Sequence, residues 1–200
     1  SDYQGLGTPG GHPYLATRPA SYSVLDAIRA VQGDPNLKIS KSVVLVGQSQ
    51  GGGAAFATAG EAVTYAPELD IRGTVATGTP YFTNDTAPVV RDPNAVSGVF
   101  AYSLYIMYLA EQADPTFRIA DFITDKAKPV IETTRTQCLM AAWNQIEKDG
   151  LNQTNTFTKD PTPEIAKFYP LMAYSTLKVK GPVFMGTGGK DKDVPPPGQE

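Results

Sequence analysis

A serine between two glycines is the first feature of this chain that could do chemistry. Ser49 lies in the segment Gly47-Gln48-Ser49-Gln50-Gly51, which has the form G-x-S-x-G. A serine hydroxyl is a weak nucleophile until a neighbouring base takes its proton, so it must project where a base and a substrate can both reach it. The G-x-S-x-G sequence meets that need by placing the serine at a strained turn from a strand into a helix. We therefore predict that Ser49 is a catalytic nucleophile that forms an acyl-enzyme.

The residues on both sides of this serine fit such a turn. The apolar run Val43–Val46 predicts a strand buried on both faces, and the Ala-rich stretch Ala54–Ala62 predicts a helix. At Gly47 and Gly51, a Cβ is expected to collide with the strand and the helix. The backbone N–H of Gln50, at the positive end of the helix, is the expected oxyanion donor. The alternative is a glycine-rich loop that binds phosphate, but the lysine of a phosphate-binding loop is missing after these glycines.

A serine nucleophile also needs a base and an acid that orients the base. Asp191 and Asp193 follow the expected strand Gly181–Gly186, where folds with this motif carry their acid. Asp191 is the expected acid, Asp193 is the less favoured alternative, and either carboxylate could be an ordinary loop residue. No histidine follows Asp191, and the one histidine, His12, lies upstream in a loop rich in glycine and proline. We therefore expect the base to lie beyond Glu200.

The order of the expected elements is that of an α/β fold. A helix capped by Ser21 or Ser23 precedes the first strand, and a second strand is expected at Ile71–Ala76. A strand, a helix and a strand in this order predict a parallel crossover. Helical patterns then dominate up to the last strand, at residues 99–112, 117–127 and 130–148.

Composition excludes several other classes of protein. The chain has 17 Lys and Arg against 20 Asp and Glu, a net charge of −3, and no basic cluster, so nucleic acid is not an expected partner. Cys138 is the single cysteine, which excludes an internal disulfide and a cysteine-based zinc site. One histidine argues against a multi-histidine metal site, and we expect no metal and no cofactor. The longest apolar stretch is too short to span a bilayer, and no signal peptide opens the chain.

At the level of motifs, the sequence resembles the secretory lipases of bacteria and fungi, which are α/β-hydrolases with a helical cap. The resemblance is carried by S-D-Y-Q-G-L-G with H-P-Y-L at residues 1–15, V-G-Q-S-Q-G-G-G-A with Y-A-P-E-L at residues 46–69, and D-K-D-V-P at residues 191–195. The last segment is similar to the D-x-x-V-P around the acid of the family and favours Asp191. The resemblance implies hydrolysis of acyl glycerols or smaller carboxylic esters. It also implies a secreted or periplasmic protein.

We accordingly expect a partial α/β-hydrolase core, a mostly parallel sheet with flanking helices, at residues 1–80 and 175–200. Residues 81–174 are expected to form a helical cap inserted into it. Only three or four strands fit in this core, so the chain looks truncated, and a complementary chain or segment is expected to complete the sheet and the triad. Two other functions remain open: a catalytically incomplete protein that binds a lipid or a partner, and an acyltransferase that uses the same serine.

Overall fold

The expected strands and crossover are present in the computed structural model, which describes residues 2–82, 92–174, 178–196 and 199. The chain divides into two compact units. The first unit contains residues 1–9, 15–87 and 169–200, and the second contains residues 10–14 and 88–168. Each unit is described separately below.

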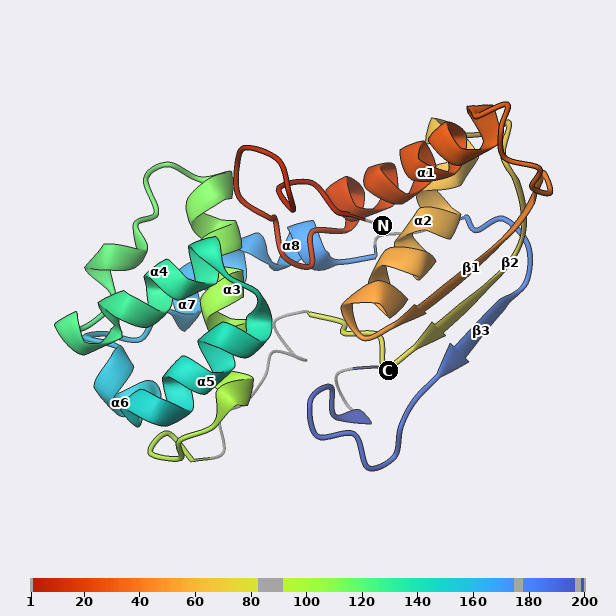
Figure 1. Ribbon diagram of the computed structural model, residues 1–200. Coiled ribbons are helices and arrows are strands. Elements are labelled where there is room, and N and C mark those ends of the chain that lie inside the picture. The colour runs from red at the N-terminus through yellow and green to blue at the C-terminus, as the bar shows by residue number, and fades with distance from the viewer. Residues whose placement is uncertain (1, 83–91, 175–177, 197–198, 200) are drawn as a thin grey trace. The chain divides into compact units, whose positions relative to one another are not determined.

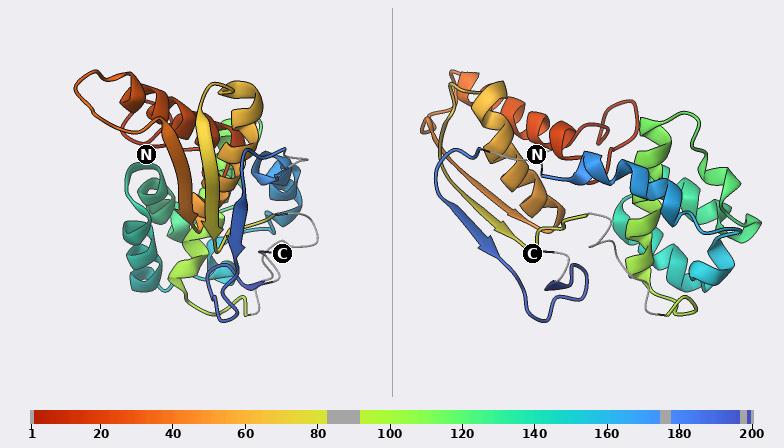
Figure 2. Two further views of the ribbon diagram at one scale, coloured as in Figure 1. Left: turned by 90° about the vertical axis from the view of Figure 1, so that its right-hand side faces the viewer. Right: turned by 180° about the vertical axis from the view of Figure 1, so that it is seen from behind.

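The first unit is built on a parallel sheet of three strands. Strand β1 spans Ser42–Gln48, β2 spans Asp70–Thr77 and β3 spans Val183–Gly186, in the order β1-β2-β3. Both pairings are parallel, as the strand–helix–strand order predicted. Helices α1 (Thr17–Gly33) and α2 (Gln50–Tyr65) lie together on one face of this sheet (Figures 1 and 2).

Alanines make the contact between α2 and the sheet. This helix has a run of small residues, and three of its alanines, Ala55, Ala59 and Ala62, belong to the core cluster. Small side chains let a helix approach a sheet closely, so larger residues on the neighbouring elements fill the space. Those larger residues are Leu25 of α1, Leu45 of β1, Leu69 directly before β2, and Ile71 of β2. This packing holds α2, and therefore its N-terminus, against the ends of β1 and β2.

Strand β1 is not buried on both faces, so that prediction is wrong for the described residues. Leu45 faces the helices and is 5% exposed, whereas Val44 and Val46 on the opposite face are 60% and 73% exposed. Phe184 of β3 is 61% exposed as well. The β-branched run identified a strand, but burial depends on what covers each face, and the two helices cover one face.

Helix α1 begins earlier than its serines suggested. It starts at Thr17 and makes no side-chain capping hydrogen bond. The hydroxyls of Ser21 and Ser23 instead donate to the carbonyl oxygens of Thr17 and Pro19, four residues back. Pro19 is tolerated because it lies in the first turn, where its missing N–H would have no helical acceptor.

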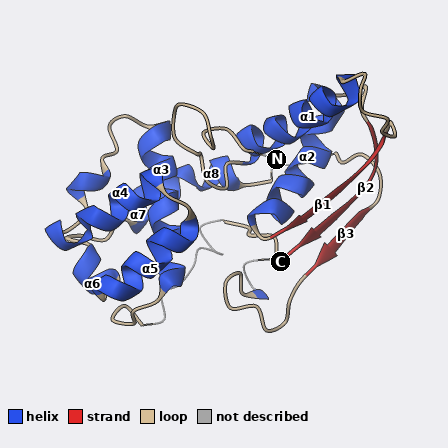
Figure 3. Cartoon of the chain, in the orientation of Figure 1, coloured by secondary structure: helices blue, strands red, loops and turns tan. Residues whose placement is uncertain are grey.

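The second unit is helical, as Figure 3 shows by colour. Its longer helices are α3 (Ala101–Ala113), α4 (Lys128–Thr136) and α5 (Leu139–Asp149), with short helices α6 (Gln153–Thr156) and α7 (Thr162–Ile165). Single 3₁₀ turns lie at η1 (Gly98–Phe100), η2 (Ile119–Asp121), η3 (Asp125–Ala127) and η4 (Ala166–Phe168). Helix α8 (Tyr169–Met172) belongs to the first unit.

Two of the helices expected in this part differ from the prediction. Residues 117–127 form the turns η2 and η3 rather than a helix, since the N–H of Thr124 donates to Thr156 and that of Thr158 donates to Phe122. The expected helix over 130–148 is divided into α4 and α5, because Gln137 and Cys138 have extended backbones. Among the helices described, none is both long and apolar enough to cross a bilayer.

Candidate active site

Ser49 occupies a strained turn between β1 and α2. Its backbone has φ of 56° and ψ of −125°, a conformation that residues with a Cβ rarely adopt. Strain of this kind costs roughly 1–3 kcal/mol and persists only where the surrounding structure enforces it. The N–H of Ser49 donates to the carbonyl oxygen of Thr77 at 2.8 Å, and its own carbonyl accepts from the N–H of Gly53 at 3.1 Å. The end of β2 and the first turn of α2 therefore both hold this residue.

The glycines around Ser49 are not equivalent. A Cβ on Gly47 would overlap the carbonyl of Gly51, and one on Gly52 would lie 2.7 Å from the carbonyl oxygen of Thr77. A Cβ on Gly51 would meet only the hydroxyl of Tyr3, at 4.0 Å. The expected collision is thus found at Gly47 and is wrong for Gly51 within the described residues. Gly52, which the motif does not contain, is the second glycine that the turn requires.

Gln50 is the first residue of α2, so its amide lies at the positive end of that helix dipole. The helix is 16 residues long, and its peptide dipoles add along the axis toward this amide. Partial positive charge therefore lies directly beside Ser49, where an ester carbonyl under attack would acquire negative charge.

Asp191 lies at the same end of the sheet as this turn. Its Oδ1 accepts hydrogen bonds from the backbone N–H groups of Asp193 and Val194, both at 3.0 Å. Its Oδ2 accepts from Nε2 of Gln199 at 3.3 Å. One carboxylate oxygen thus closes the loop after β3. Asp193 is exposed and contributes its N–H to this loop, so the geometry distinguishes the two aspartates.

Gly78 separates Asp191 from Ser49. It follows β2 with φ of +56°, and its N–H donates to the carbonyl oxygen of Gly186 in β3 at 2.9 Å. A Cβ on Gly78 would lie 3.4 Å from Oδ2 of Asp191 and 3.8 Å from the N atom of Ser49. The structure therefore brings Ser49 and Asp191 together around Gly78, a glycine outside the G-x-S-x-G motif. Its sequence signal was the Gly-Thr-Pro segment directly after the second strand.

His12 belongs to the second unit, whereas Ser49 and Asp191 belong to the first. Its carbonyl oxygen accepts a hydrogen bond from Nε2 of Gln112 at 3.2 Å. Its ring lies edge-on to that of Tyr14, with the ring centroids 6.3 Å apart. No described residue of the first unit is a histidine, so the structure brings no imidazole of that unit to Ser49 or Asp191.

A parallel sheet with its serine at a strand-to-helix turn defines the α/β-hydrolase class, and comparisons with solved structures agree. The structure resembles the rice cell wall degrading esterase LipA from Xanthomonas oryzae, with a TM-score of 0.76 and 18% identity over 96% of this chain and 56% of that one. It resembles lipase A of Candida antarctica with a TM-score of 0.67 and 23% identity, over 92% of this chain and 44% of that one. A putative hydrolase from Legionella pneumophila matches with a TM-score of 0.72 and 19% identity, over 97% of this chain and 56% of that one.

Within the α/β-hydrolase class, the sequence identifies the family. The model of the secretory lipase family matches residues 1–166, and the chain belongs to this family. A search of curated proteins finds no match. The chain spans a little over half the length of LipA, the first solved structure above.

Proposed function

We propose that this chain carries the nucleophile of a carboxylic ester hydrolase that acts on acyl glycerols or smaller carboxylic esters through an acyl-enzyme. The observation that carries the proposal is the backbone of Ser49, whose positive φ places a hydroxyl-bearing residue at the turn from β1 into α2. A binding protein has no use for strain at that point, whereas a nucleophile needs the exposure that the turn provides.

In the proposed reaction, Oγ of Ser49 attacks the ester carbonyl carbon while a base takes the hydroxyl proton. The N–H of Gln50 stabilises the oxyanion of the tetrahedral intermediate, and the base then protonates the leaving alcohol. Water, activated by the same base, attacks the acyl-enzyme and releases the carboxylic acid and free Ser49. Asp191 orients the base through Oδ2, which accepts one long hydrogen bond, from Nε2 of Gln199 at 3.3 Å, whereas Oδ1 accepts two from the loop after β3.

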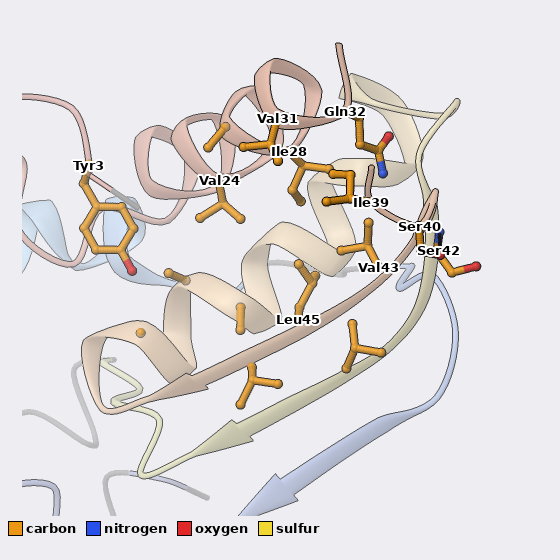
Figure 4. A pocket seen from close by; sticks show the side chains of 16 residues that line it. Tyr3, Val24, Ile28, Val31, Gln32, Ile39, Ser40, Ser42, Val43 and Leu45 are labelled. Atoms are coloured by element: carbon orange, nitrogen blue, oxygen red, sulfur yellow. Dashed lines mark hydrogen bonds between the residues drawn. The ribbon is translucent and has the colours of Figure 1, made fainter. Parts of the chain in front are cut away.

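We propose that the base is a histidine beyond Glu200, on a complementary segment or chain that also extends the sheet. Support comes from an apolar groove of about 700 Å³ along β1, with lining residues such as Val24, Ile28, Ile39 and Val43 (Figure 4). Strand β1 is an edge strand among the described residues. An unpaired, apolar edge is a site for adding another strand.

Two further parts of the proposal follow from family membership. Residues 81–174 lie between β2 and β3 in the sequence, and we assign them the role of a cap over the acyl-binding pocket. The family is described as secretory, and we propose that the protein acts outside the cytoplasm.

The test is fluorophosphonate labelling followed by intact-mass measurement, on the wild-type chain and on Ser49→Ala. A fluorophosphonate reacts at a useful rate only with an activated serine. Labelling that is lost in Ser49→Ala supports the nucleophile, and His12→Gln then shows whether His12 is the base. A folded chain that stays unlabelled, while a longer form of the encoded protein is labelled, supports a base outside this chain. An unlabelled serine in both forms contradicts the proposal and favours a binding protein.

A further inference from the structure

The segment that follows β2 is fixed by hydrogen bonds from three different parts of the first unit. The carbonyl oxygen of Thr77 accepts from Ser49, and the N–H of Gly78 donates to Gly186 of β3. The third hydrogen bond comes from a side chain: the hydroxyl of Tyr174 donates to the carbonyl oxygen of Pro80 at 2.9 Å. This side chain reaches back over 94 residues of sequence.

The ring of Tyr174 is held in place from two sides. Its centroid lies 5.4 Å from that of Phe56 in α2, edge to face, and 6.0 Å from that of Tyr81, stacked. A Cβ on Gly53, in the first turn of α2, would overlap the hydroxyl. A hydroxyl in this position therefore requires glycine at residue 53.

The hydroxyl of Tyr174 remains a hydrogen-bond donor at every pH at which an ester hydrolase works. Burial raises the pKa of Tyr174 well above the ordinary value for tyrosine, so the neutral form persists. The acceptor, a proline carbonyl, does not titrate. The contact between them is consequently independent of pH in that range.

The segment that this hydrogen bond restrains is the one between the proposed nucleophile and the proposed acid. Gly78, two residues before Pro80, faces Oδ2 of Asp191 and the N atom of Ser49. The residue between them, Thr79, is 4% exposed and packs against Gly52 in the first turn of α2. A shift of Pro80 would therefore be transmitted over two buried residues to the gap between Ser49 and Asp191.

We propose that Tyr174 is a positioning residue that sets the spacing of Ser49 and Asp191 by anchoring the carbonyl of Pro80. The proposal rests on the function assigned above to Ser49 and Asp191, and it adds a residue that the G-x-S-x-G motif does not reveal. Tyr174 touches neither the reacting atoms nor the substrate in this role. It acts through the backbone of residues 78–80.

The principal variant is Tyr174→Phe, which keeps the ring and removes the donor. A small misplacement of catalytic groups reduces the rate of the chemical step strongly. In an ester-hydrolysing form of the protein, we expect kcat for a short-chain p-nitrophenyl ester to fall about tenfold while KM changes less than about twofold. The matched control is Tyr65→Phe, which removes a tyrosine hydroxyl that donates to Asp26 from the opposite end of α2. The control should retain wild-type kcat.

A second readout does not require turnover. Amide hydrogen exchange measures how firmly the Ser49–Thr77 and Gly78–Gly186 hydrogen bonds are held. The amides of Ser49 and Gly78 should exchange faster in Tyr174→Phe than in the wild type and in Tyr65→Phe. The Tm of Tyr174→Phe should stay within a few degrees of the wild-type Tm. Gly53→Ala, which displaces the hydroxyl by contact, should accelerate the same two amides.

These measurements separate the proposal from the function on which it rests. A longer form of the encoded protein that hydrolyses no ester would count against the proposed function, and the exchange data on this chain would still decide whether Tyr174 orders the segment. Unchanged exchange at Ser49 and Gly78 overturns the positioning role. A lower Tm with unchanged kcat also overturns it, because Tyr174 would then only stabilise the fold.

Discussion

Gly47 and Gly51 approach each other so closely that a Cβ on Gly47 would overlap the carbonyl of Gly51. The turn at Ser49 thus depends on a missing side chain at the end of β1. A Cβ on Gly51 would instead meet only the hydroxyl of Tyr3, 4.0 Å away. The two glycines of the motif therefore differ in what they do for the fold.

This difference predicts unequal effects of two alanine substitutions. Gly47→Ala forces β1 and α2 apart and should cost about 2 kcal/mol, as overpacking of a dense region does. For a chain of this size, the corresponding fall in Tm is about 4–8 °C. Gly51→Ala is the matched control and should shift Tm by less than about 2 °C. Thermal unfolding followed by circular dichroism measures both, and equal losses would contradict the assignment.

The strain at Ser49 predicts a gain in stability when its Cβ is removed. Ser49→Gly relieves roughly 1–3 kcal/mol of strain and loses roughly 0.5–1 kcal/mol to the greater freedom of glycine in the unfolded chain. The net effect is a stabilisation of about 1 kcal/mol, or about 2–4 °C in Tm. Ser49→Ala keeps the Cβ and the strain and should unfold at the wild-type temperature. A Tm for Ser49→Gly at or below that of Ser49→Ala would show that the turn is unstrained.

Substitution of the two aspartates distinguishes the proposed acid from its neighbour. Asp191→Asn keeps an oxygen for the N–H groups of Asp193 and Val194, so the loop should persist while the negative charge is lost. Loss of the acid from a serine–histidine–acid set reduces kcat by about 10⁴-fold. Asp193→Asn, at an exposed side chain, should leave kcat within about twofold. Steady-state kinetics on an ester-hydrolysing form of the protein measures this, and the reverse ranking would make Asp193 the acid.

An ionic contact between α1 and the loop before β2 predicts acid-dependent stability of the first unit. Arg29 of α1 donates to Glu68, at 2.7 Å, and this hydrogen bond holds the pKa of that carboxyl below its usual value of 4.5. Because the folded pKa is lowered, the stabilisation is present above the usual glutamate pKa and is lost as pH falls through the lowered one. Arg29→Gln should therefore lower Tm at pH 7 and have little effect in strong acid.

The control for that experiment is Arg72→Gln. Arg72 pairs with Asp70 two residues away in the same strand, so the contact lies within one element. Pairs of this kind contribute little to stability. The Tm of both variants is measured from neutral to acid pH. A similar fall in Tm at pH 7 for Arg29→Gln and Arg72→Gln would contradict the structural role of Arg29.

Local sequence was sufficient for the elements whose patterns agree with their surroundings. The run Val43–Val46, the alanines after Ser49 and the strand at Ile71–Ala76 each lie inside the observed element. Residues 117–127 form no α-helix, although their apolar spacing is helical. There, Phe117 and Phe122 stack with centroids 5.1 Å apart, and hydrogen bonds to residues 156–158 replace those of a helix. Contacts between distant segments outweighed a weak local preference.

For the site, the sequence by itself determined the turn that holds Ser49, the proposed nucleophile, because a serine between glycines after an apolar strand indicates a turn that neighbouring residues build. It also indicated the loop of Asp191, which follows a strand in the order that the class requires. Only the tertiary structure decided which glycines the turn needs, that Gly78 lies between Ser49 and Asp191, and that Tyr174 anchors Pro80. These facts depend on distances between residues that are far apart in the chain. Such distances are set by how helices and strands pack, and no local pattern records them.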